Sequence, residues 1–266
     1  MSLHRPTGRS EKGILRVVSA ALLTLCLMAV AAGCCLADGL PCVAILVDDL
    51  GFSLDAARQL AAIPFPLTWA IIPYERHSLA TAELAAREGI PFILHLPMEA
   101  IGDREKGRHS LIETRLGAEA IRLRVRNALW SLPGACGMNN HRGSRATQDG
   151  RVMGAVLAEA VAEGVFFIDS RTSGNSLAYE TAREMGVQSA RNVSFIDHEN
   201  NTAFMKRQMA KVVQMARQKG RALAICHARP GTIRFLSGLY ETIGTDVQFV
   251  TVPEYLKSGS SGAGEE

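Results

Sequence analysis

The sequence predicts an α/β fold with a parallel β-sheet, and two observations lead to this prediction. Seven short, nearly all-apolar runs recur along the chain, and stretches with helical amphipathic spacing lie between most of them. Strands that are buried on both faces of a parallel sheet have such sequences, and their alternation with helices is typical of the α/β class. The 266 residues are 47% hydrophobic and 21% charged, which fits a globular protein whose length suits one α/β barrel.

The apolar runs are the strands that we expect. They lie at Val43–Val47, Leu67–Ile72, Pro91–Leu94, Ala135–Met138, Val165–Ile168, Ala222–Cys226 and Val247–Val252. The expected helices lie at 53–62, 78–88, 117–131, 148–163 and 202–219. Ser53 can cap the first helix, and Gly89, Gly164 and Gly220 follow three others as stop signals. No linker or internal repeat divides the chain, so residues 38–257 are expected to form one domain.

The first 37 residues have the layout of an export signal. Residues 5–16 hold four basic side chains against one acidic side chain, and residues 17–37 carry no charge over 21 positions. A positive region followed by an apolar run and small residues marks secretion, and about 20 apolar residues also suffice to span a bilayer. The segment is therefore predicted to be a signal peptide or a membrane anchor. Cleavage near Ala37, an uncleaved anchor and lipid attachment at Cys34 all remain open, and each places the rest of the chain in the bacterial periplasm or cell envelope.

Charge in the exported part is balanced. The first 37 residues hold four of the 29 basic and one of the 26 acidic residues, which leaves 25 of each sign. A neutral domain has no general electrostatic attraction for nucleic acid, so we expect no nucleic-acid partner. We expect contact with a membrane only through the N-terminal segment. Residues 258–266 are rich in Gly and Ser and are predicted to be a disordered tail.

Polar residues follow five of the apolar runs. They are Asp48 and Asp49, His95, Asn139, Asn140 and His141, Asp169, and His227. The carboxyl ends of parallel strands lie on one side of a sheet, and sites assemble there. A single strand-end Asp often caps a turn, and a lone His is more often a core residue. Five such strand ends together favour a functional site.

The residue types indicate the chemistry of this site. The sequence has no GxSxG elbow, no P-loop and no GxGxxG after the first strand. The available carboxylates and imidazoles bind divalent metals and transfer protons. A metal held by Asp and His, with one open position, can activate water for hydrolysis, while a separate carboxylate acts as base and a separate His as acid.

Five sequence blocks carry a resemblance to a known family. They are VAILVDDLG, ILHLPME, NNHRGSRAT, FFIDSRTSG and AICHARP, in this order. They resemble the divergent polysaccharide deacetylases over about residues 42–256. That family is related to esterases that remove N-acetyl groups from chitin oligomers and peptidoglycan. The resemblance implies a distorted seven-stranded (β/α) barrel, a divalent metal that is often zinc, and attack of water on an acetamide.

The resemblance also implies roles for individual residues. The implied metal ligands are Asp49, His95, His141 and Glu99. The implied catalytic residues are Asp48 as general base, His227 as general acid, and Asp169. The residues expected to contact substrate are Asn140, Arg142 and Arg171.

Two functions from different classes remain open. The first is an exported metal-dependent hydrolase, with zinc as the expected metal, that deacetylates an N-acetylated polysaccharide such as peptidoglycan. The second is a non-catalytic envelope protein that uses the same barrel to bind a glycan or a protein. Glu99 stands where related deacetylases have a second His, and their Arg-Pro-Tyr-type loop is absent, which favours the second function. Because Asp48 and His227 are present as spare proton-transfer groups, we expect the hydrolase.

Overall fold

The computed structural model describes residues 39–103, 110–240 and 247–260. The predicted signal or anchor segment, residues 1–37, lies outside this part of the chain, as do residues 261–266. From Leu40 on, the described residues form one compact unit. Among the described residues, no helix is both long enough and apolar enough to span a membrane.

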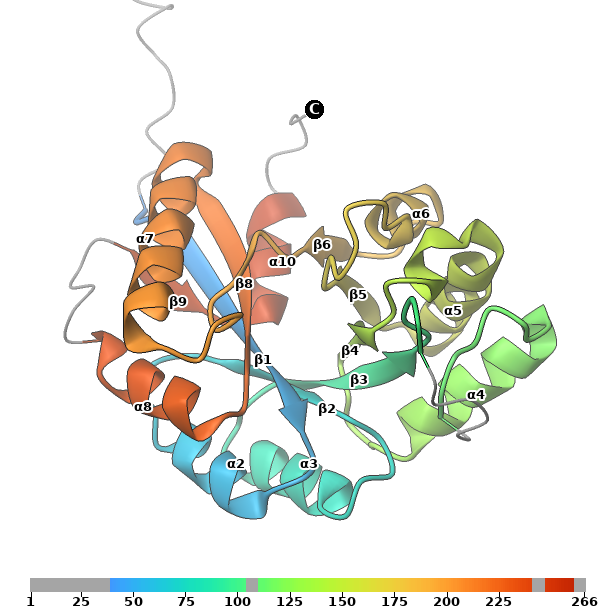
Figure 1. Ribbon diagram of the computed structural model, residues 1–266, viewed down its shortest axis with the longest axis horizontal. Coiled ribbons are helices and arrows are strands. Elements are labelled where there is room, and N and C mark those ends of the chain that lie inside the picture. Colours follow the sequence, from blue (N-terminus) through green and yellow to red (C-terminus); the bar gives the residue numbers. More distant parts are fainter. Residues whose placement is uncertain (1–38, 104–109, 241–246, 261–266) are drawn as a thin grey trace, which may run out of the picture. The chain divides into compact units, whose positions relative to one another are not determined.

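The core of the fold is one sheet in which every strand pairing is parallel (Figure 1). Its strands are β1 (Cys42–Leu50), β2 (Thr68–Ile71), β3 (Phe92–Met98), β4 (Gly137–Arg142), β5 (Phe166–Asp169), β6 (Ser189–Arg191), β7 (Ser194–Phe195), β8 (Arg221–His227) and β9 (Gln248–Val250). The order in the sheet is β6-β5-β4-β3-β2-β1-β8-β7, and β9 pairs with β1.

One segment of chain joins the two edges of this sheet. The edge strands β6 and β7 are consecutive, with only Asn192 and Val193 between them. The backbone N–H of Asn192 donates to the carbonyl of Asp169 in β5, and that of Val193 donates to the carbonyl of Leu223 in β8. Counted as one kinked strand, β6 and β7 close a barrel of seven strands, with β9 as an extra short strand on β1. This arrangement confirms the distorted (β/α) barrel.

Helices cover the outside of the barrel. They are α2 (Leu54–Ala61), α3 (Ser78–Arg87), α4 (Ala118–Trp130), α5 (Gly150–Glu163), α6 (Ala178–Glu184), α7 (Thr202–Lys219) and α8 (Pro230–Ser237), with a 3₁₀ turn, η1 (Ala146–Gln148), before α5. The last helix, α10 (Val252–Ser260), packs against the inner face of the sheet. Ser53 Oγ accepts a hydrogen bond from the N–H of Ala56, which confirms the predicted cap. Gly164 and Gly220 end α5 and α7 in the left-handed conformation that favours glycine.

Several strands extend further toward their carboxyl ends than the sequence predicts. β1 continues to Leu50, β3 continues to Met98, and β4 spans Gly137–Arg142. The predicted site residues in these strands therefore lie within them, not after them. The reason is that backbone pairing in a parallel ladder does not depend on whether a side chain is apolar.

The C-terminal end also differs from the prediction. Val252, expected to end a strand, begins α10, and this helix continues to Ser260. Residues 258–260 of the predicted tail thus lie within this helix, and residues 261–266 lie outside the described residues. The short elements β6, β7, α6 and α8 were not predicted because none is long enough to show a clear hydrophobic period.

Apolar side chains fill both faces of the sheet. In β1, Ile45 packs with the helices outside the barrel, whereas its neighbours Ala44 and Leu46 belong to a second buried cluster inside it. That second cluster includes Tyr255 and Leu256, so α10 closes the inner face of the barrel (Figure 1). Apolar side chains from the sheet and from α10 thus pack together inside the barrel.

A buried ion-pair cluster joins α4 to α5. Glu159 is fully buried, and its carboxylate accepts hydrogen bonds from Arg122 at 2.7 Å and from Arg126 at 3.0 Å twice. Burial alone would raise the pKa of Glu159, but the two guanidinium groups lower it. Both arginines are partly exposed, so only the carboxylate is completely removed from water.

We expect Glu159→Ala to lower the free energy of unfolding by about 1–3 kcal/mol, because it removes the hydrogen bonds that a buried carboxylate accepts from two arginines. Urea denaturation measures this change. The matched control is Glu163→Ala, at an exposed position of the same helix, which should change the free energy of unfolding by less than about 0.5 kcal/mol. Equal effects of the two substitutions would contradict the expectation.

Candidate metal and proton-transfer site

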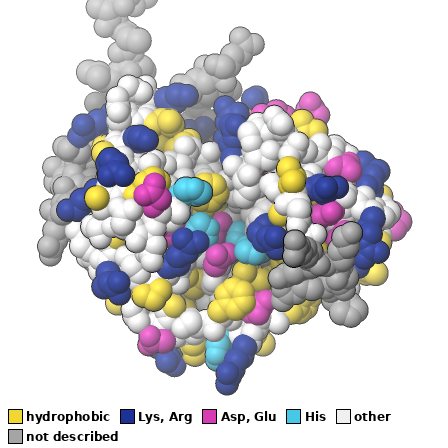
Figure 2. Space-filling model, viewed as in Figure 1, with side chains coloured by type: hydrophobic (Ala, Val, Ile, Leu, Met, Phe, Trp, Pro, Cys, Tyr) yellow, Lys and Arg dark blue, Asp and Glu magenta, His cyan; other side chains and the backbone are white. Residues whose placement is uncertain are grey.

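The predicted strand-end residues meet at one end of the barrel. In the sheet register, Asp48 of β1 lies opposite His227 of β8, and His95 of β3 lies opposite Asn139 of β4. Figure 2 shows histidine and acidic side chains gathered near the middle of one face of the molecule, with basic side chains beside them. The carboxyl ends of the strands therefore form the polar site that the sequence indicates.

An irregularity in β1 turns two adjacent carboxylates toward one imidazole. Successive side chains of a regular strand point to opposite faces. The pairing of β1 with β2 shifts register between Val47 and Leu50, and Asp49 has a φ of 63°. As a result, Asp48 Oδ2 lies 3.6 Å and Asp49 Oδ1 lies 3.3 Å from Nε2 of His95.

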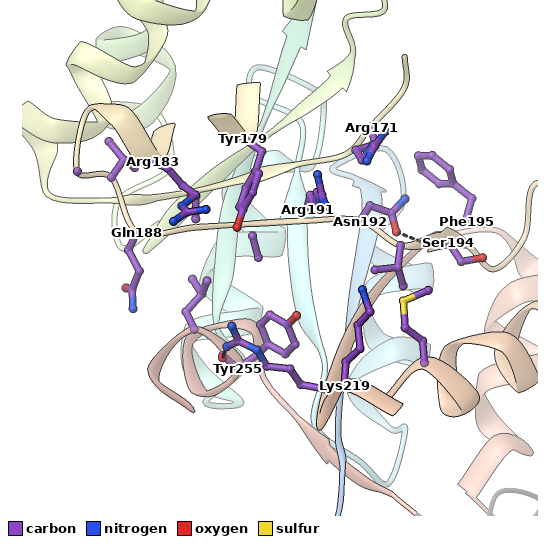
Figure 3. Close-up of a pocket in the computed structure, with 18 residues that line it drawn as sticks. Arg171, Tyr179, Arg183, Gln188, Arg191, Asn192, Ser194, Phe195, Lys219 and Tyr255 are labelled. Atoms are coloured by element: carbon purple, nitrogen blue, oxygen red, sulfur yellow. Dashed lines mark hydrogen bonds between the residues drawn. The ribbon is translucent and has the colours of Figure 1, made fainter. Parts of the chain in front are cut away.

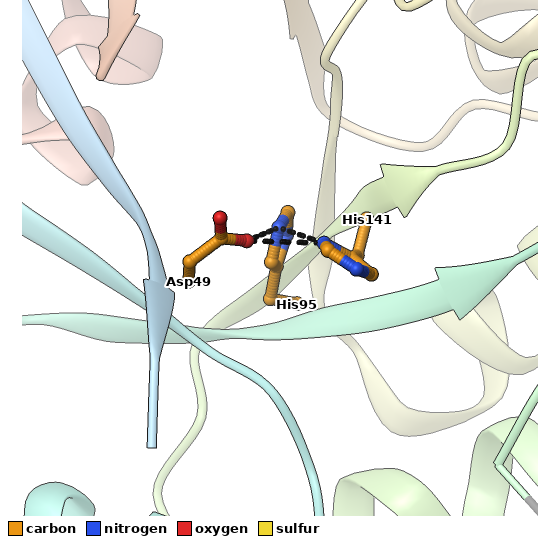
Figure 4. A group of neighbouring side chains, drawn as sticks. All are labelled: Asp49, His95 and His141. Carbon is orange, nitrogen blue, oxygen red and sulfur yellow. Dashed lines mark hydrogen bonds and ion pairs between the residues drawn. The ribbon is translucent and has the colours of Figure 1, made fainter. Parts of the chain in front are cut away.

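Asp49, His95 and His141 form a compact group of possible metal ligands (Figure 4). His141 Nδ1 lies 3.0 Å from Asp49 Oδ1 and 3.1 Å from His95 Nε2. Asp49 Oδ1 is buried and makes no hydrogen bond of good geometry, although both ring nitrogens are close to it. The described part of the chain contains no second group of three or more possible metal ligands.

The geometry of the group fits a divalent metal. Ligand bonds of about 2.0–2.1 Å place neighbouring ligand atoms about 3.0–3.4 Å apart. The three separations here are 3.0, 3.1 and 3.3 Å. One carboxylate and two imidazoles are a donor set that zinc and related ions accept, and three protein ligands leave positions open for water and substrate. The unpartnered Asp49 oxygen is explained if a cation binds between these three atoms.

Asn139 fixes both His95 and Asp48, and the sequence analysis did not give it a role. Its Nδ2 donates to Asp48 Oδ1 at 2.9 Å, so its Oδ1 is the atom that lies 2.8 Å from His95 Nδ1. Nδ1 must then carry the proton, and Nε2 presents its lone pair to Asp49 and His141. Asn139 and His141 are two positions apart in β4 and share a face of the sheet, whereas Asn140 between them does not. This alternation is the signal that would have found Asn139.

The electrostatics differ between the two carboxylates. Burial raises the pKa of Asp48 to about 6. Burial alone would also raise the pKa of Asp49, but His141 and His95 lower it below the usual range. Burial lowers the pKa of His141, whereas in His95 the neighbouring Asp48 and Asp49 outweigh burial and raise the pKa. Asp49 is thus held in its charged form as a ligand must be, while Asp48 is a stronger base than an ordinary Asp.

His227 is held by a buried carboxylate that the sequence analysis missed. Asp197 is fully buried, and its Oδ1 lies 2.8 Å from His227 Nδ1. Its Oδ2 accepts from the His227 backbone N–H and from Thr232 Oγ1. Burial alone would lower the pKa of His227, but Asp197 raises it. Asp197 follows Phe195-Ile196 as the other site residues follow their strands, but β7 has only two residues and gave no detectable pattern.

Backbone strain gathers at the same end of the barrel. Four described residues other than glycine have left-handed φ values of 52° to 63°, namely Asp49, Tyr74, Arg142 and Arg171. They lie at or just after the carboxyl ends of β1, β2, β4 and β5. Each such conformation costs about 1–2 kcal/mol, and residues of this kind cluster at functional sites.

The structure does not bring Glu99 to the metal-type group. Its Oε2 accepts hydrogen bonds from the backbone N–H and the hydroxyl of Thr114 at 2.7 and 2.6 Å, and its Oε1 lies 3.6 Å from Arg145. Glu99 comes after the last residue of β3, and its carboxylate holds a neighbouring loop. The prediction that Glu99 ligates the metal does not fit this geometry.

Asn140 and Asp169 also have structural partners. Both are 1% exposed. Asn140 accepts from the N–H of Ser170 and donates to the carbonyl of Arg142, and Asp169 accepts from the N–H of Arg171. These groups hold the loop after β5, and the substrate contact predicted for Asn140 and the catalytic role predicted for Asp169 stay predictions.

Arg142 and Arg171 keep accessible guanidinium groups near the site. Arg142 is an exposed residue that pairs with Asp103 at 3.2 Å. Arg171 follows β5 and lines a groove on the side of the barrel. Their contact with substrate stays a prediction.

The fold and the site together define the class of the protein. It is a parallel (β/α) barrel. At the carboxyl ends of its strands lie the group of Asp49, His95 and His141 and the separate pair of Asp197 and His227. The sequence profile of the divergent polysaccharide deacetylases matches residues 45–256, and the chain belongs to this family. The family match confirms the resemblance seen in the five sequence blocks.

Relatives and one solved structure extend this comparison. An uncharacterized protein of Haemophilus influenzae is 34% identical over 78% of this chain and 74% of its own length. The Escherichia coli protein YibQ, also uncharacterized, is 28% identical over 80% of this chain and 67% of its own length. A crystal structure of an uncharacterized protein from Agrobacterium tumefaciens shares the fold with a TM-score of 0.77, at 20% identity, over 82% of this chain and 90% of that chain.

The metal-type group leads to a binding prediction. We expect the purified protein to hold about one divalent ion per chain, and we expect Asp49→Ala and His141→Ala to lose it, because each removes one of three ligands. Elemental analysis after incubation with zinc, manganese or nickel measures the content.

The control for this experiment is Glu99→Gln, which should keep its metal because Glu99 lies outside the group. Loss of metal in Glu99→Gln, with Asp49→Ala unaffected, would show that the ligands were assigned wrongly.

Proposed function

We propose that this protein is an exported, metal-dependent hydrolase that removes acetyl groups from an N-acetylated glycan. The observation that carries the proposal is that one end of the barrel combines a metal-type group with two separate proton-transfer groups, Asp48 and His227. Membership of the deacetylase family supports hydrolysis of an amide C–N bond. Peptidoglycan is the first candidate substrate, because the predicted export places the domain in the cell envelope.

Asp48 is the proton acceptor in this proposal. Its carboxylate lies beside the metal-type group without belonging to it. Asn139 holds Oδ1, which leaves Oδ2 on the side of His95. With a pKa raised to about 6, Asp48 is ionised at neutral pH and can still take a proton from the water that attacks the acetamide carbon.

His227 is the proton donor. Asp197 occupies Nδ1, so Nε2 is the ring nitrogen that is free to act on a substrate. The charge of Asp197 favours the protonated ring, and Nε2–H can protonate the leaving amine nitrogen as the C–N bond breaks. Asp197 acts only through His227 and is therefore a positioning residue.

Asp49, His95 and His141 would hold a divalent ion, zinc as the first expectation, which polarises a carbonyl group and lowers the pKa of water. Asn139 orients His95 for this role and at the same time holds Asp48. The ligand positions and the base are therefore fixed relative to each other.

The base assignment predicts that Asp48→Asn lowers kcat/KM by about 10²–10⁴-fold, the usual contribution of a general base, and leaves the metal content unchanged. Acetate release from N-acetylated chitin oligomers and from peptidoglycan fragments measures turnover. Asp55→Asn, at an exposed position of α2, is the matched control and should keep full activity.

Full turnover by the Asp48→Asn protein would show that Asp48 is not the general base. If the unaltered protein binds glycans but releases acetate from none of them, the non-catalytic envelope protein becomes the better description.

A second prediction concerns the pH dependence of turnover. Asp197→Asn removes the charge that raises the pKa of His227, so His227 loses its proton at a lower pH. Because a general acid is active only while protonated, activity should decline at a lower pH on the alkaline side of the kcat/KM profile. A reduced rate with an unchanged profile would mean that Asp197 matters only for folding.

A further inference from the structure

A large groove on the side of the barrel is not used by the proposed reaction (Figure 3). It has a volume of about 1020 Å³ and follows the segment from Gly186 to Phe195, the same segment that closes the barrel. Helix α6 borders one side, and the end of α7, the start of β8 and α10 border the other. Pockets for single small ligands span about 300–1,000 Å³. The groove lies at the upper limit of this range, so it has room for an oligomer.

The charges that line this groove have one sign. Its basic residues are Arg171, Arg183, Arg191, Lys219 and Arg221, and no Asp or Glu lines it. Among the described residues, Arg191 has a carboxylate partner, Glu180 at 3.5 Å, and the other four have none within ion-pair distance. Outside its first 37 residues the chain has no net charge, so the groove is a local concentration of positive charge in a neutral domain. A cleft lined by one sign of charge attracts ligands of the opposite sign.

Two tyrosines hold three of these arginines in place. The guanidinium groups of Arg191 and Arg183 lie 5.2 and 6.0 Å from the ring centre of Tyr179. Arg221 lies 4.9 Å from the ring centre of Tyr255 and donates to its carbonyl at 3.1 Å. Cation–π contacts of this kind restrict the arginine side chains. The arginines are thus ordered before a ligand arrives, and their planar donors suit carboxylates.

One end of the groove lies beside His227, the proposed proton donor, and Phe195 lies between the two. Phe195 lines the groove, and its ring stacks on His227 with ring centres 5.9 Å apart and an angle of 13° between the planes. Arg171, at the same end of the barrel, follows β5 directly. From Gln188 to Phe195 the segment is roughly 23 Å long, at about 3.3 Å per residue. A polymer that lies along the groove would therefore extend to Phe195, the residue that contacts His227.

We propose that this groove binds the carboxylate-bearing part of an acidic glycan strand, so that the substrate is an N-acetylated glycan with acidic groups and not a neutral one. This inference rests on the proposed function for the identity of the polymer. The positive charge of the groove is the reason to expect acidic groups on the ligand. The contact between Phe195 and His227 is the reason to expect that the groove and the site of reaction bind the same strand.

The test compares two N-acetylated hexasaccharides that differ in charge. Hyaluronan hexasaccharide carries carboxylates, and the N-acetylated chitin hexamer carries none. Binding to the purified full-length protein in non-ionic detergent is measured by calorimetry, with the Asp48→Asn protein as a second sample in which the ligand stays intact. We expect hyaluronan to bind at least about tenfold more tightly than the chitin hexamer, and more weakly as the salt concentration rises.

Variants locate the binding site. Arg183→Gln combined with Lys219→Gln should weaken hyaluronan binding about tenfold or more and leave binding of the chitin hexamer unchanged. The matched control combines Arg58→Gln with Lys211→Gln, which removes the same charges from exposed positions outside the groove and should change neither affinity.

The outcomes separate this inference from the proposed function. Equal binding of the two glycans, or equal effects of the two double variants, would overturn the inference whether or not acetate is released. Binding of poly-glutamate in the groove with no binding of hyaluronan would also overturn it, in favour of an acidic protein partner. Groove-dependent binding of hyaluronan without turnover of any glycan would support the inference and contradict only the catalytic proposal.

Discussion

The site depends on one constraint in β1, which is that two consecutive side chains must face the same side of a strand. A regular strand cannot satisfy this requirement, because its side chains alternate. The register shift between Val47 and Leu50 and the left-handed backbone of Asp49 satisfy it at the expense of local strain. β1 can carry this strain because its first residues, from Cys42 on, pair regularly with both β8 and β9. The regular pairing at the start of β1 thus supports the distorted end of the same strand.

Asn139 holds Asp48, at this distortion, in a fixed position relative to His95. It donates to the proposed base, Asp48, and accepts from the proposed ligand, His95. An ionised Asp48 therefore requires one amide orientation, and that orientation requires one tautomer of His95. The charge state of the base and the lone pair offered to a metal are linked through a single buried side chain. Asp197 has the same function for His227, and in both cases a fully buried polar residue fixes the state of a proposed functional group.

The sequence predicts the four strand ends that meet at the site, those of β1, β3, β4 and β8, because an apolar run that stops at a carboxylate or imidazole is visible without a structure. Asp48, Asp49, His95, His141 and His227 were found in this way. The substrate contact of Asn140 stays a prediction, and the alternation of side chains along β4 is the signal that indicates a role for Asn139 as well. Asp197 was missed because a strand of two residues leaves no pattern. The contact of Glu99 with Thr114 could not be predicted, because it joins segments whose approach depends on the tertiary fold. The resemblance indicated the barrel, but not the kinked closing segment that distorts it.

That segment also explains why the groove lies where it does. In an evenly closed barrel, one strand pairs with both neighbours along its whole length, and no room is left beside it. Here β6 pairs only with β5 and β7 pairs only with β8, so each half leaves one edge unpaired. The groove follows this segment from end to end, and Phe195 at its far end contacts His227. The distortion of the barrel and the position of the groove beside the proposed proton donor are therefore consequences of the same short, kinked strand, whereas most of the positive charge of the groove comes from the elements that border it.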